Sequence, residues 1–256
     1  DVNRVTVGFS GGIDSSLIAL LSSRFVDTEL VTVGMGGAEI EHAREAVDLL
    51  GLRLIAKVHT VDDLREAIPR VLWLIEEPNL MKLGVAIPFY WASREGAARR
   101  RRVMLSGQGS DEMYGGYARY LRIYRDEGPD AVDRAMLSDV VRAYEVNYER
   151  DNKACACNKV EVRHPFADWG VVGFSLSLPV GFKIASGEDL LRKRIVRRVG
   201  EMVGLPKRIV DRPKRAVQYS SGVDRAIRRV ARGMGLRPQE YVLRVFHEVF
   251  GFKRPA

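Results

Sequence analysis

Short apolar runs rich in β-branched residues recur along the first half of the chain, and segments with helical periodicity separate them. In the segment 39–50, for example, the apolar residues fall on one helical face, and Gly51 ends the pattern. Strands are therefore predicted at 4–9, 30–35, 52–58 and 103–106, with helices after residue 16 and at 39–50, 61–75 and 85–98.

Strands that alternate with helices imply right-handed crossovers and a parallel sheet covered on both faces. Beyond about Asp126 the strand signals stop, and helices are predicted at 130–149, 189–203, 222–233 and 238–250. The expected fold class is α/β: a Rossmann-like parallel sheet sandwiched by helices, followed by a helical C-terminal half. We place an α/β core at 1–127 and a helical subdomain that completes the site at 128–256.

Composition places the chain among soluble globular proteins. Its 256 residues are enough to bury a sizeable core. No apolar run approaches the ~20 residues that span a bilayer, and the first residues show no signal pattern, so we expect no membrane and a cytoplasmic location. The net charge of +8 suits a polyanionic ligand and would also suit RNA.

The arginines and the two cysteines have simpler explanations than a further binding site. The run 99–102 is expected to be a solvated helix end, which the helix dipole favours. Arginines at 225, 228, 229 and 232 share one helical face, and nucleic-acid binding through them is the less favoured interpretation. Cys155 and Cys157 lack the further ligands of a zinc site and are interpreted as structural thiols.

The first predicted strand runs directly into a phosphate-loop candidate, Ser-Gly-Gly-Ile-Asp-Ser-Ser at residues 10–16. Gly11 and Gly12 allow a sharp turn that brings backbone amides close to phosphate oxygens. Ser10, Ser15 and Ser16 add hydroxyl donors, and the following helix directs its positive N-terminal end to the same point. The pattern predicts a site for a polyphosphate.

A second turn of the same kind follows the fourth predicted strand, at residues 106–117. Asp14 in the first loop would repel a bare phosphate, so it makes sense only with a metal ion between the two. Because both turns lie at the carboxyl ends of parallel strands, Asp14 and Asp111 are placed to share one magnesium ion. Taken alone, Asp111 would be explained as an ordinary first-turn residue that complements the helix dipole.

The loop 10–16 has neither the Walker nor the dinucleotide spacing, and it resembles the pyrophosphate loop of the N-type ATP pyrophosphatases (the PP-loop superfamily). The segment 106–117, SGQGSDEMYGGY, resembles the second signature of the asparagine synthetase family. Further stretches similar to that family follow in order at 152–154, 160–168, 190–192 and 212–218. The chain thus resembles the C-terminal synthetase domain of that family over most of its length.

The resemblance implies a role for individual residues. The pyrophosphate part of ATP would be held by Ser10, Gly11, Gly12, Ser15 and Ser16. Asp14 and Asp111 would bind Mg²⁺, with Asp111 counted among the catalytic residues. Val33 would lie near adenine, with Ser106 and Gly107 near the ribose. Lys214 would reach the α and β phosphates and stabilise the charge on the departing pyrophosphate, a role that suits a compact cation on a flexible stem.

The family reaction has two steps. A substrate carboxylate, aspartate by default, attacks the α-phosphate of ATP, and pyrophosphate leaves; ammonia then attacks the acyl-adenylate, and AMP leaves. A separate glutaminase subunit and a homodimer are further expectations. The alternatives are an ATP pyrophosphatase that modifies tRNA, a cyclising ligase similar to β-lactam synthetase, and a non-catalytic adenine-nucleotide sensor.

Three departures from the family pattern concern the second step more than ATP binding. The chain begins almost at the phosphate loop, and we expect a standalone form that lacks the N-terminal glutaminase domain. Gln108 stands where the synthetases usually have glutamate, and an amide cannot act as a base. Glu188 or Asp189 falls where a lysine often precedes the Leu-Leu-Arg stretch.

Overall fold

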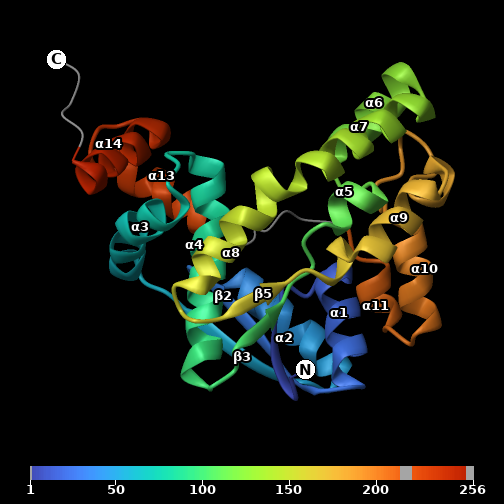
Figure 1. The fold of residues 1–256 in the computed structure, drawn as a ribbon, viewed down its shortest axis with the longest axis horizontal. Coiled ribbons are helices and arrows are strands. Elements are labelled where there is room, and N and C mark those ends of the chain that lie inside the picture. The colour runs from blue at the N-terminus through green and yellow to red at the C-terminus, as the bar shows by residue number, and fades with distance from the viewer. Residues whose placement is uncertain (1, 214–220, 252–256) are drawn as a thin grey trace.

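The computed structural model describes residues 2–213 and 221–251, which form a parallel β-sheet flanked by helices (Figure 1). Five strands pair in the order β3-β2-β1-β4-β5, and all four pairings are parallel. The strands are β1 (Arg4–Gly8), β2 (Asp27–Gly34), β3 (Arg53–Val58), β4 (Val103–Leu105) and β5 (Glu161–Arg163). The predicted α/β fold class is confirmed, because helices follow the successive strands and cover the sheet.

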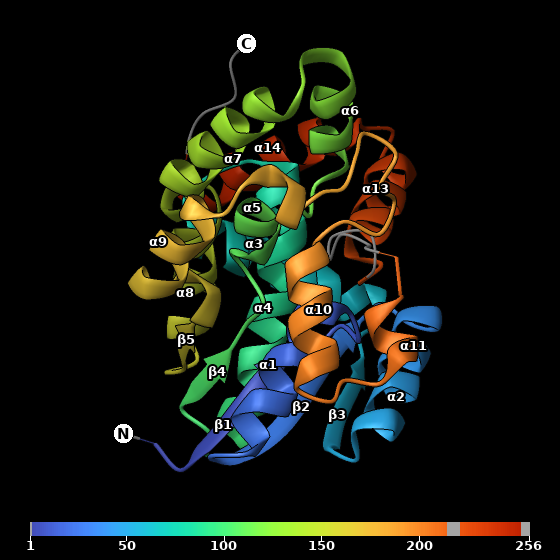
Figure 2. The ribbon, with the colours of Figure 1, turned by 90° about the vertical axis from the view of Figure 1, so that its right-hand side faces the viewer.

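One face of the sheet packs against α1 (Ile13–Ser23) and α2 (Ala38–Leu50). Val7 of β1 and Leu30 of β2 are fully buried in this layer. The short α11 (Lys207–Val210) joins the same layer, and α10 (Arg194–Met202) packs on α1 beside it (Figure 2). Segments from the far end of the chain therefore cover the helix that follows the phosphate-loop candidate.

The opposite face carries the larger part of the core. Val31 and Val33 of β2 point to this face, because successive strand residues alternate between faces. Residues of five helices complete the cluster: α3 (Val61–Ile75), α4 (Leu80–Ala98), α8 (Glu149–Ala156), α13 (Val223–Gly233) and α14 (Pro238–Phe250). Helices from both halves of the chain thus cover this face of the sheet.

The second half is largely helical, as predicted. Besides the elements above it contains α7 (Pro129–Ala143), the π-helical η1 (Tyr144–Tyr148), the 3₁₀ turns η2 (Pro165–Ala167) and η3 (Val180–Phe182), α9 (Trp169–Ser177) and α10 (Arg194–Met202). Along the chain, α5 (Ser110–Tyr114) and α6 (Ala118–Glu127) come between β4 and α7. The division at residue 127 stays a prediction, and β5 from beyond it joins the sheet of the first half.

Three local predictions differ from the structure. Strand signals do not stop near Asp126, because β5 pairs with β4; its three residues are too few to show a periodicity. The helix predicted at 130–149 passes through the π-helical η1 before it continues as α8. The helix predicted from residue 189 begins only at Arg194. The Asp189 carboxylate accepts hydrogen bonds from the backbone N–H groups of Ala185 and Arg192, and these bonds hold residues 185–192 in a turn instead of a helix.

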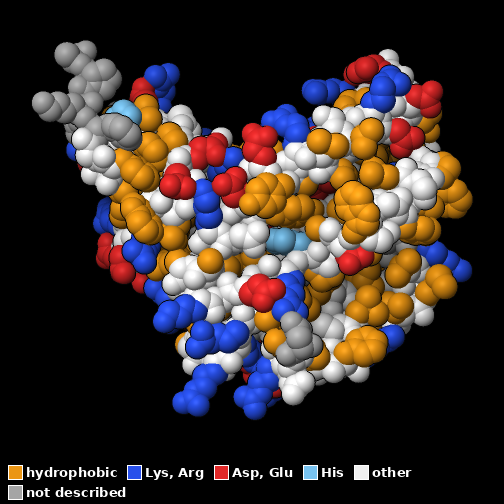
Figure 3. Space-filling view, viewed as in Figure 1, with side chains coloured by type: hydrophobic (Ala, Val, Ile, Leu, Met, Phe, Trp, Pro, Cys, Tyr) orange, Lys and Arg blue, Asp and Glu red, His pale blue; other side chains and the backbone are white. Residues whose placement is uncertain are grey.

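The surface separates apolar from basic regions. Exposed apolar side chains gather over the side of the molecule where α9 lies (Figure 3), and Trp169, Phe174 and Phe182 are more than half exposed. The arginines of the face predicted on α13 are all exposed. None of the helices among the described residues is both long and apolar enough to cross a bilayer.

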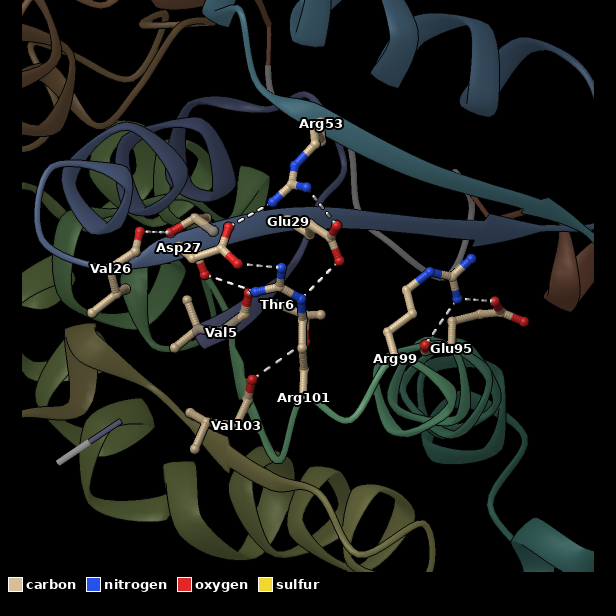
Figure 4. Close-up of polar contacts among 11 residues, drawn as sticks. Val5, Thr6, Val26, Asp27, Glu29, Arg53, Glu95, Arg99, Arg101 and Val103 are labelled. Carbon is tan, nitrogen blue, oxygen red and sulfur yellow. Dashed lines mark hydrogen bonds and ion pairs between the residues drawn. The ribbon is translucent and has the colours of Figure 1, made fainter. Parts of the chain in front are cut away.

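The arginine run at the end of α4 is only partly a solvated helix end. Arg101 is 4% exposed and reaches under the sheet, where it donates to Glu29 Oε2 at 2.7 Å and to Asp27 Oδ2 at 2.8 Å (Figure 4). It also donates to the backbone oxygens of Val5 and Asp27. The expectation of a solvated run is wrong at this position, since the carboxylates of the neighbouring β2 attract one arginine inwards.

Candidate active site

The phosphate-loop candidate joins β1 to α1 as predicted. Gly12 is the N-cap of α1 and no side chain caps the helix there. Ser10 and Ser15 organise the turn, because the Ser15 hydroxyl accepts from the Ser10 backbone N–H and lies 3.2 Å from the Ser10 hydroxyl. Gly11 adopts φ +72° and packs against α2, where a Cβ would lie 3.1 Å from the His42 carbonyl oxygen. The loop therefore presents an uncapped helix N-terminus flanked by hydroxyl groups.

The second turn, after β4, contacts the first. A Cβ on Gly107 would lie 2.9 Å from Asp14 Cβ and 3.3 Å from the Ser15 nitrogen, so only glycine allows this approach. The Ser110 hydroxyl, at the start of α5, donates to Asp14 Oδ1 at 2.8 Å. The two turns predicted to face one another across the sheet edge are in direct contact.

The two acidic residues predicted to bind a metal converge on one point. Lys193 Nζ lies 2.6 Å from Asp14 Oδ2 and 2.6 Å from Asp111 Oδ1, and its side chain is fully buried. The same ammonium also donates to the Ser110 hydroxyl at 3.2 Å. Lys193 was missed by the sequence reasoning, although it directly follows the Leu-Leu-Arg stretch at 190–192.

The donor set suits a magnesium ion that shares its ligands with a nucleotide. Among the described residues no three His, Cys, Asp or Glu side chains are grouped to hold a metal by themselves. Two convergent carboxylates are what a Mg²⁺ ion uses when phosphate oxygens and water fill its remaining positions. Asp14 and Asp111 therefore fit a metal that arrives with polyphosphate.

A cavity of about 740 Å³ opens beside these turns and extends between α4 and α7. It is lined by seven residues of the predicted site: Ser10, Asp14, Ser15, Ser106, Gly107, Gln108 and Asp111. Gly11, Gly12 and Ser16 lie in the loop behind this lining, and Val33 is buried in the core against the helices of the larger layer. Ser16 is fully buried, and its hydroxyl has no hydrogen-bond partner among the described residues. Lys214 lies outside the described residues.

The cavity lining also includes a buried acidic group, Glu112, that was not assigned to the site from the sequence. Glu112 accepts from the Tyr117 hydroxyl at 2.5 Å and from the Asn147 amide at 2.6 Å. Burial raises the pKa of Glu112 above its usual value, and the bond from Tyr117 opposes the rise. Asn147 reaches this point from the π-helical η1, so the irregular helix serves the cavity.

Gln108, the departure from the family pattern, lies close to a second buried acid. Asp151 is fully buried, and Arg150 Nε donates to it at 2.9 Å. Burial raises the pKa of Asp151, while Arg150 and the Gln108 side chain act in the opposite direction. The Asp151 carboxylate thus lies next to the Gln108 amide but does not line the cavity.

The predicted ribose side contains a serine–histidine contact. Ser106 Oγ lies 2.9 Å from His164 Nδ1 and accepts from the Gln108 backbone N–H at 3.1 Å. Burial, assisted by the charge of Arg150, lowers the pKa of His164 to about 4. The imidazole is therefore neutral near pH 7, and it stacks on Tyr148 with ring centroids 4.7 Å apart.

Comparison with known proteins gives consistent matches. The asparagine synthase family model matches residues 2–129 and 124–241. A putative glutamine-hydrolyzing asparagine synthetase of Methanocaldococcus jannaschii is 36% identical over 264 residues, which cover 91% of this chain and 49% of that protein. Asparagine synthetase 1 of Lotus japonicus, also named glutamine-hydrolyzing, is 28% identical over 84% of this chain and 38% of its own length. The chain thus spans about half or less of these relatives.

A solved structure also matches part of this chain. It is the predicted subunit of a tRNA methyltransferase from Methanocaldococcus jannaschii, with a TM-score of 0.38 and 15% sequence identity. The match covers 79% of this chain and 89% of that one.

Proposed function

The chain belongs to the asparagine synthase family, and we propose that it activates a carboxylate with ATP, releasing pyrophosphate, and then forms an amide. The observation that supports this most strongly is the contact between the two strand-end turns. It brings Asp14 and Asp111 to one point beside an uncapped helix N-terminus, where the phosphates of a nucleotide would lie.

In the proposed first step, an oxygen of the substrate carboxylate attacks the α-phosphorus of ATP. The bond from that phosphorus to the bridging oxygen breaks, and pyrophosphate takes the electron pair. Ser10 and Ser15 and the first amides of α1 hold the departing pyrophosphate, and Lys214 balances its charge. A magnesium ion on Asp14 and Asp111 would supply further charge neutralisation. The protein contributes alignment and a fixed electrostatic environment.

In the proposed second step, ammonia attacks the carbonyl carbon of the acyl-adenylate, the carbon–oxygen bond to AMP breaks, and the nitrogen loses a proton. Aspartate is the default carboxylate, and the cytoplasm is the proposed location. The relatives are named for glutamine hydrolysis, so we propose a glutaminase domain or subunit as the ammonia source. Gln108 does not accept this proton as a base, which leaves solvent or another group to do so.

The test is pyrophosphate release from ATP and Mg²⁺ with separate substrates. Release that requires aspartate and yields asparagine when ammonium is present supports the ligase. Release that requires tRNA would replace it with RNA modification, and release with a substrate that forms its own ring would indicate a cyclising ligase. Nucleotide binding without release under any condition would indicate a sensor.

Two variants on one helix locate the site. Ser15→Ala removes the hydroxyl that organises the loop, and we expect pyrophosphate release to fall by roughly tenfold or more, as when one stabilising donor is lost. Ser23→Ala removes a similar hydroxyl at the other end of α1, where it donates to the Leu20 carbonyl, and should leave the rate unchanged. Lys214→Ala should abolish release. Full activity in Ser15→Ala and Lys214→Ala would contradict the site.

A further inference from the structure

A buried ammonium group occupies the point on which the two metal-binding candidates converge. Lys193 Nζ lies 2.6 Å from a carboxylate oxygen of Asp14 and 2.6 Å from one of Asp111. The Lys193 side chain is fully buried, and the two carboxylates are only 11% and 18% exposed. Lysine is rarely buried unless it is paired, so these contacts explain its place in the interior.

The surrounding backbone is arranged to hold this ammonium in place. Arg192 and Lys193 both adopt positive φ angles, +55° and +53°, which long side chains seldom adopt. Hydrogen bonds hold both the side chain and the backbone of Arg192. Its guanidinium donates to the Gly116 carbonyl at 2.7 Å, and its own carbonyl accepts from the Arg197 side chain at 2.8 Å. Backbone strain of this kind persists only where the surrounding contacts over-determine it.

Gly116 provides the space for the arrangement. A Cβ at this position would overlap both Asp111 Oδ1 and Lys193 Cε. The carboxylate and the lysine stem therefore pack directly against backbone that has no side chain. Three separate segments, at residues 14, 111–116 and 192–193, are shaped around one ammonium group.

We propose that Lys193 is a built-in counterion for Asp14 and Asp111, which keeps free divalent cations out until a nucleotide brings one. This inference rests on the proposed function, which assigns the two carboxylates to Mg²⁺. Two carboxylates without the lysine would attract a divalent cation directly. The ammonium neutralises one of their charges and repels a second cation at short range in a poorly solvated site. The polyphosphate of ATP adds the negative charge and oxygen ligands that outweigh this repulsion.

The order of binding follows from this charge balance. The metal enters as its ATP complex, and metal alone binds weakly. A protein of this design does not collect metal ions when ATP is absent, and its two acidic residues stay correctly placed for the next nucleotide. Lys193 is thus a positioning residue for the carboxylates rather than a group that reacts.

The test measures Mn²⁺ binding, by electron paramagnetic resonance of the free ion, in the full chain without nucleotide. Lys193→Met keeps most of the length of the side chain but removes the charge, and we expect it to bind free Mn²⁺ roughly tenfold or more tightly than the wild type does. Lys193→Arg keeps the charge and should bind as weakly as the wild type. Lys183→Met is the matched control, since Lys183 is a buried lysine whose nearest carboxylate, on Asp133, is 3.9 Å away.

A second measurement needs no variant. The thermal midpoint of the wild type should not change with Mn²⁺ alone and should rise when Mn²⁺ and ATP are added together. Adding Asp111→Asn to Lys193→Met should remove the gain in Mn²⁺ binding, which would locate the ion at this pair.

The results separate this inference from the function on which it rests. Tight binding of free Mn²⁺ by the wild type, equal to that of Lys193→Met, would overturn the counterion role and leave ATP activation standing. A wild type that binds no Mn²⁺ even with ATP, and releases no pyrophosphate, would overturn both.

Discussion

Arg101 is expected to be a principal stabilising residue of the sheet, and Arg101→Met is the change that tests this. Its side chain is 5% exposed, and the guanidinium donates to two carboxylates and two backbone carbonyls on β1 and β2. Methionine retains most of the apolar stem but none of the donors. The variant would leave Glu29 and the carbonyl of Val5 buried without this partner.

The magnitude follows from the exposure of the partners. Removing one member of a buried ion pair costs about 3–5 kcal/mol. Asp27 is 42% exposed and Glu29 15%, and both also contact Arg53, so the lower end of that range applies. We expect a loss of about 3 kcal/mol in the free energy of unfolding, which lowers the thermal midpoint by about 6–12 °C in a chain of this size.

The assay is urea unfolding of matched variants. Arg99→Met is the control, because Arg99 pairs with Glu95 at the exposed end of α4, two residues before Arg101. Exposed pairs four residues apart on a helix contribute about 0.3–0.5 kcal/mol to stability. Arg101 also lowers the pKa of Asp27, so the wild type gains stability above pH ~4 that disappears as the pH falls below that value. Arg101→Met should lose part of this pH dependence.

A result that would refute the reasoning is a stability of Arg101→Met within about 1 kcal/mol of Arg99→Met. It would mean that water and Arg53 satisfy the carboxylates as well as the buried guanidinium does. An unchanged acid profile would contradict the assigned link between Arg101 and Asp27.

Three further predictions concern the cavity. Gly116→Ala should reduce pyrophosphate release by roughly tenfold or more, because the new methyl group displaces Asp111. Gly181→Ala is the control, since its methyl group would meet nothing within 4 Å and the rate should not change. Equal rates in the two variants would contradict the packing of Gly116 against Asp111. Gln108→Glu should raise ammonia-dependent amide formation by roughly tenfold or more and leave pyrophosphate release unchanged. The measurement is the amount of amide formed per AMP released. No gain in this ratio would mean that the base is a different group. The pKa of His164 is about 4 in the folded protein against 6.5 normally, so unfolding free energy should fall as the pH drops from about 6.5 toward 4. In urea titrations at pH 5 and 7, the His164→Asn variant should lose less stability at the lower pH than the wild type does. If the variant lost as much stability as the wild type, the result would argue against a buried neutral imidazole at residue 164.

Elements with strong local signals were predictable from sequence. The helix α3 begins at Val61 and ends at Ile75 as predicted, because Thr60 and Asp63 form a capping box and the apolar face is regular. The phosphate loop was predictable for the same reason, since glycines and hydroxyls follow a buried strand without interruption. Here local chemistry and the final structure agree.

Features set by distant partners were not predictable. Arg101 looks like its three neighbours in the sequence, and only the position of Asp27 and Glu29 on β2 selects it for burial. Lys193 was missed because the apolar pattern around it favours a continuous helix, and the turn that Asp189 holds open is set by side-chain hydrogen bonds. The π-helical turn that carries Asn147 to Glu112 leaves no mark on the periodicity.

The late position of β5 in the chain has a consequence for biosynthesis. During translation, β1 to β4 leave the ribosome well before residues 161–163 do. The edge of β4 that later pairs with β5 therefore has no partner strand during that interval. Open strand edges invite pairing with other chains. The helices α13 and α14 that cover the larger core layer emerge later still. Nascent chains halted before β5 should therefore aggregate more readily than the finished protein, which makes the second half a folding requirement as well as a part of the site.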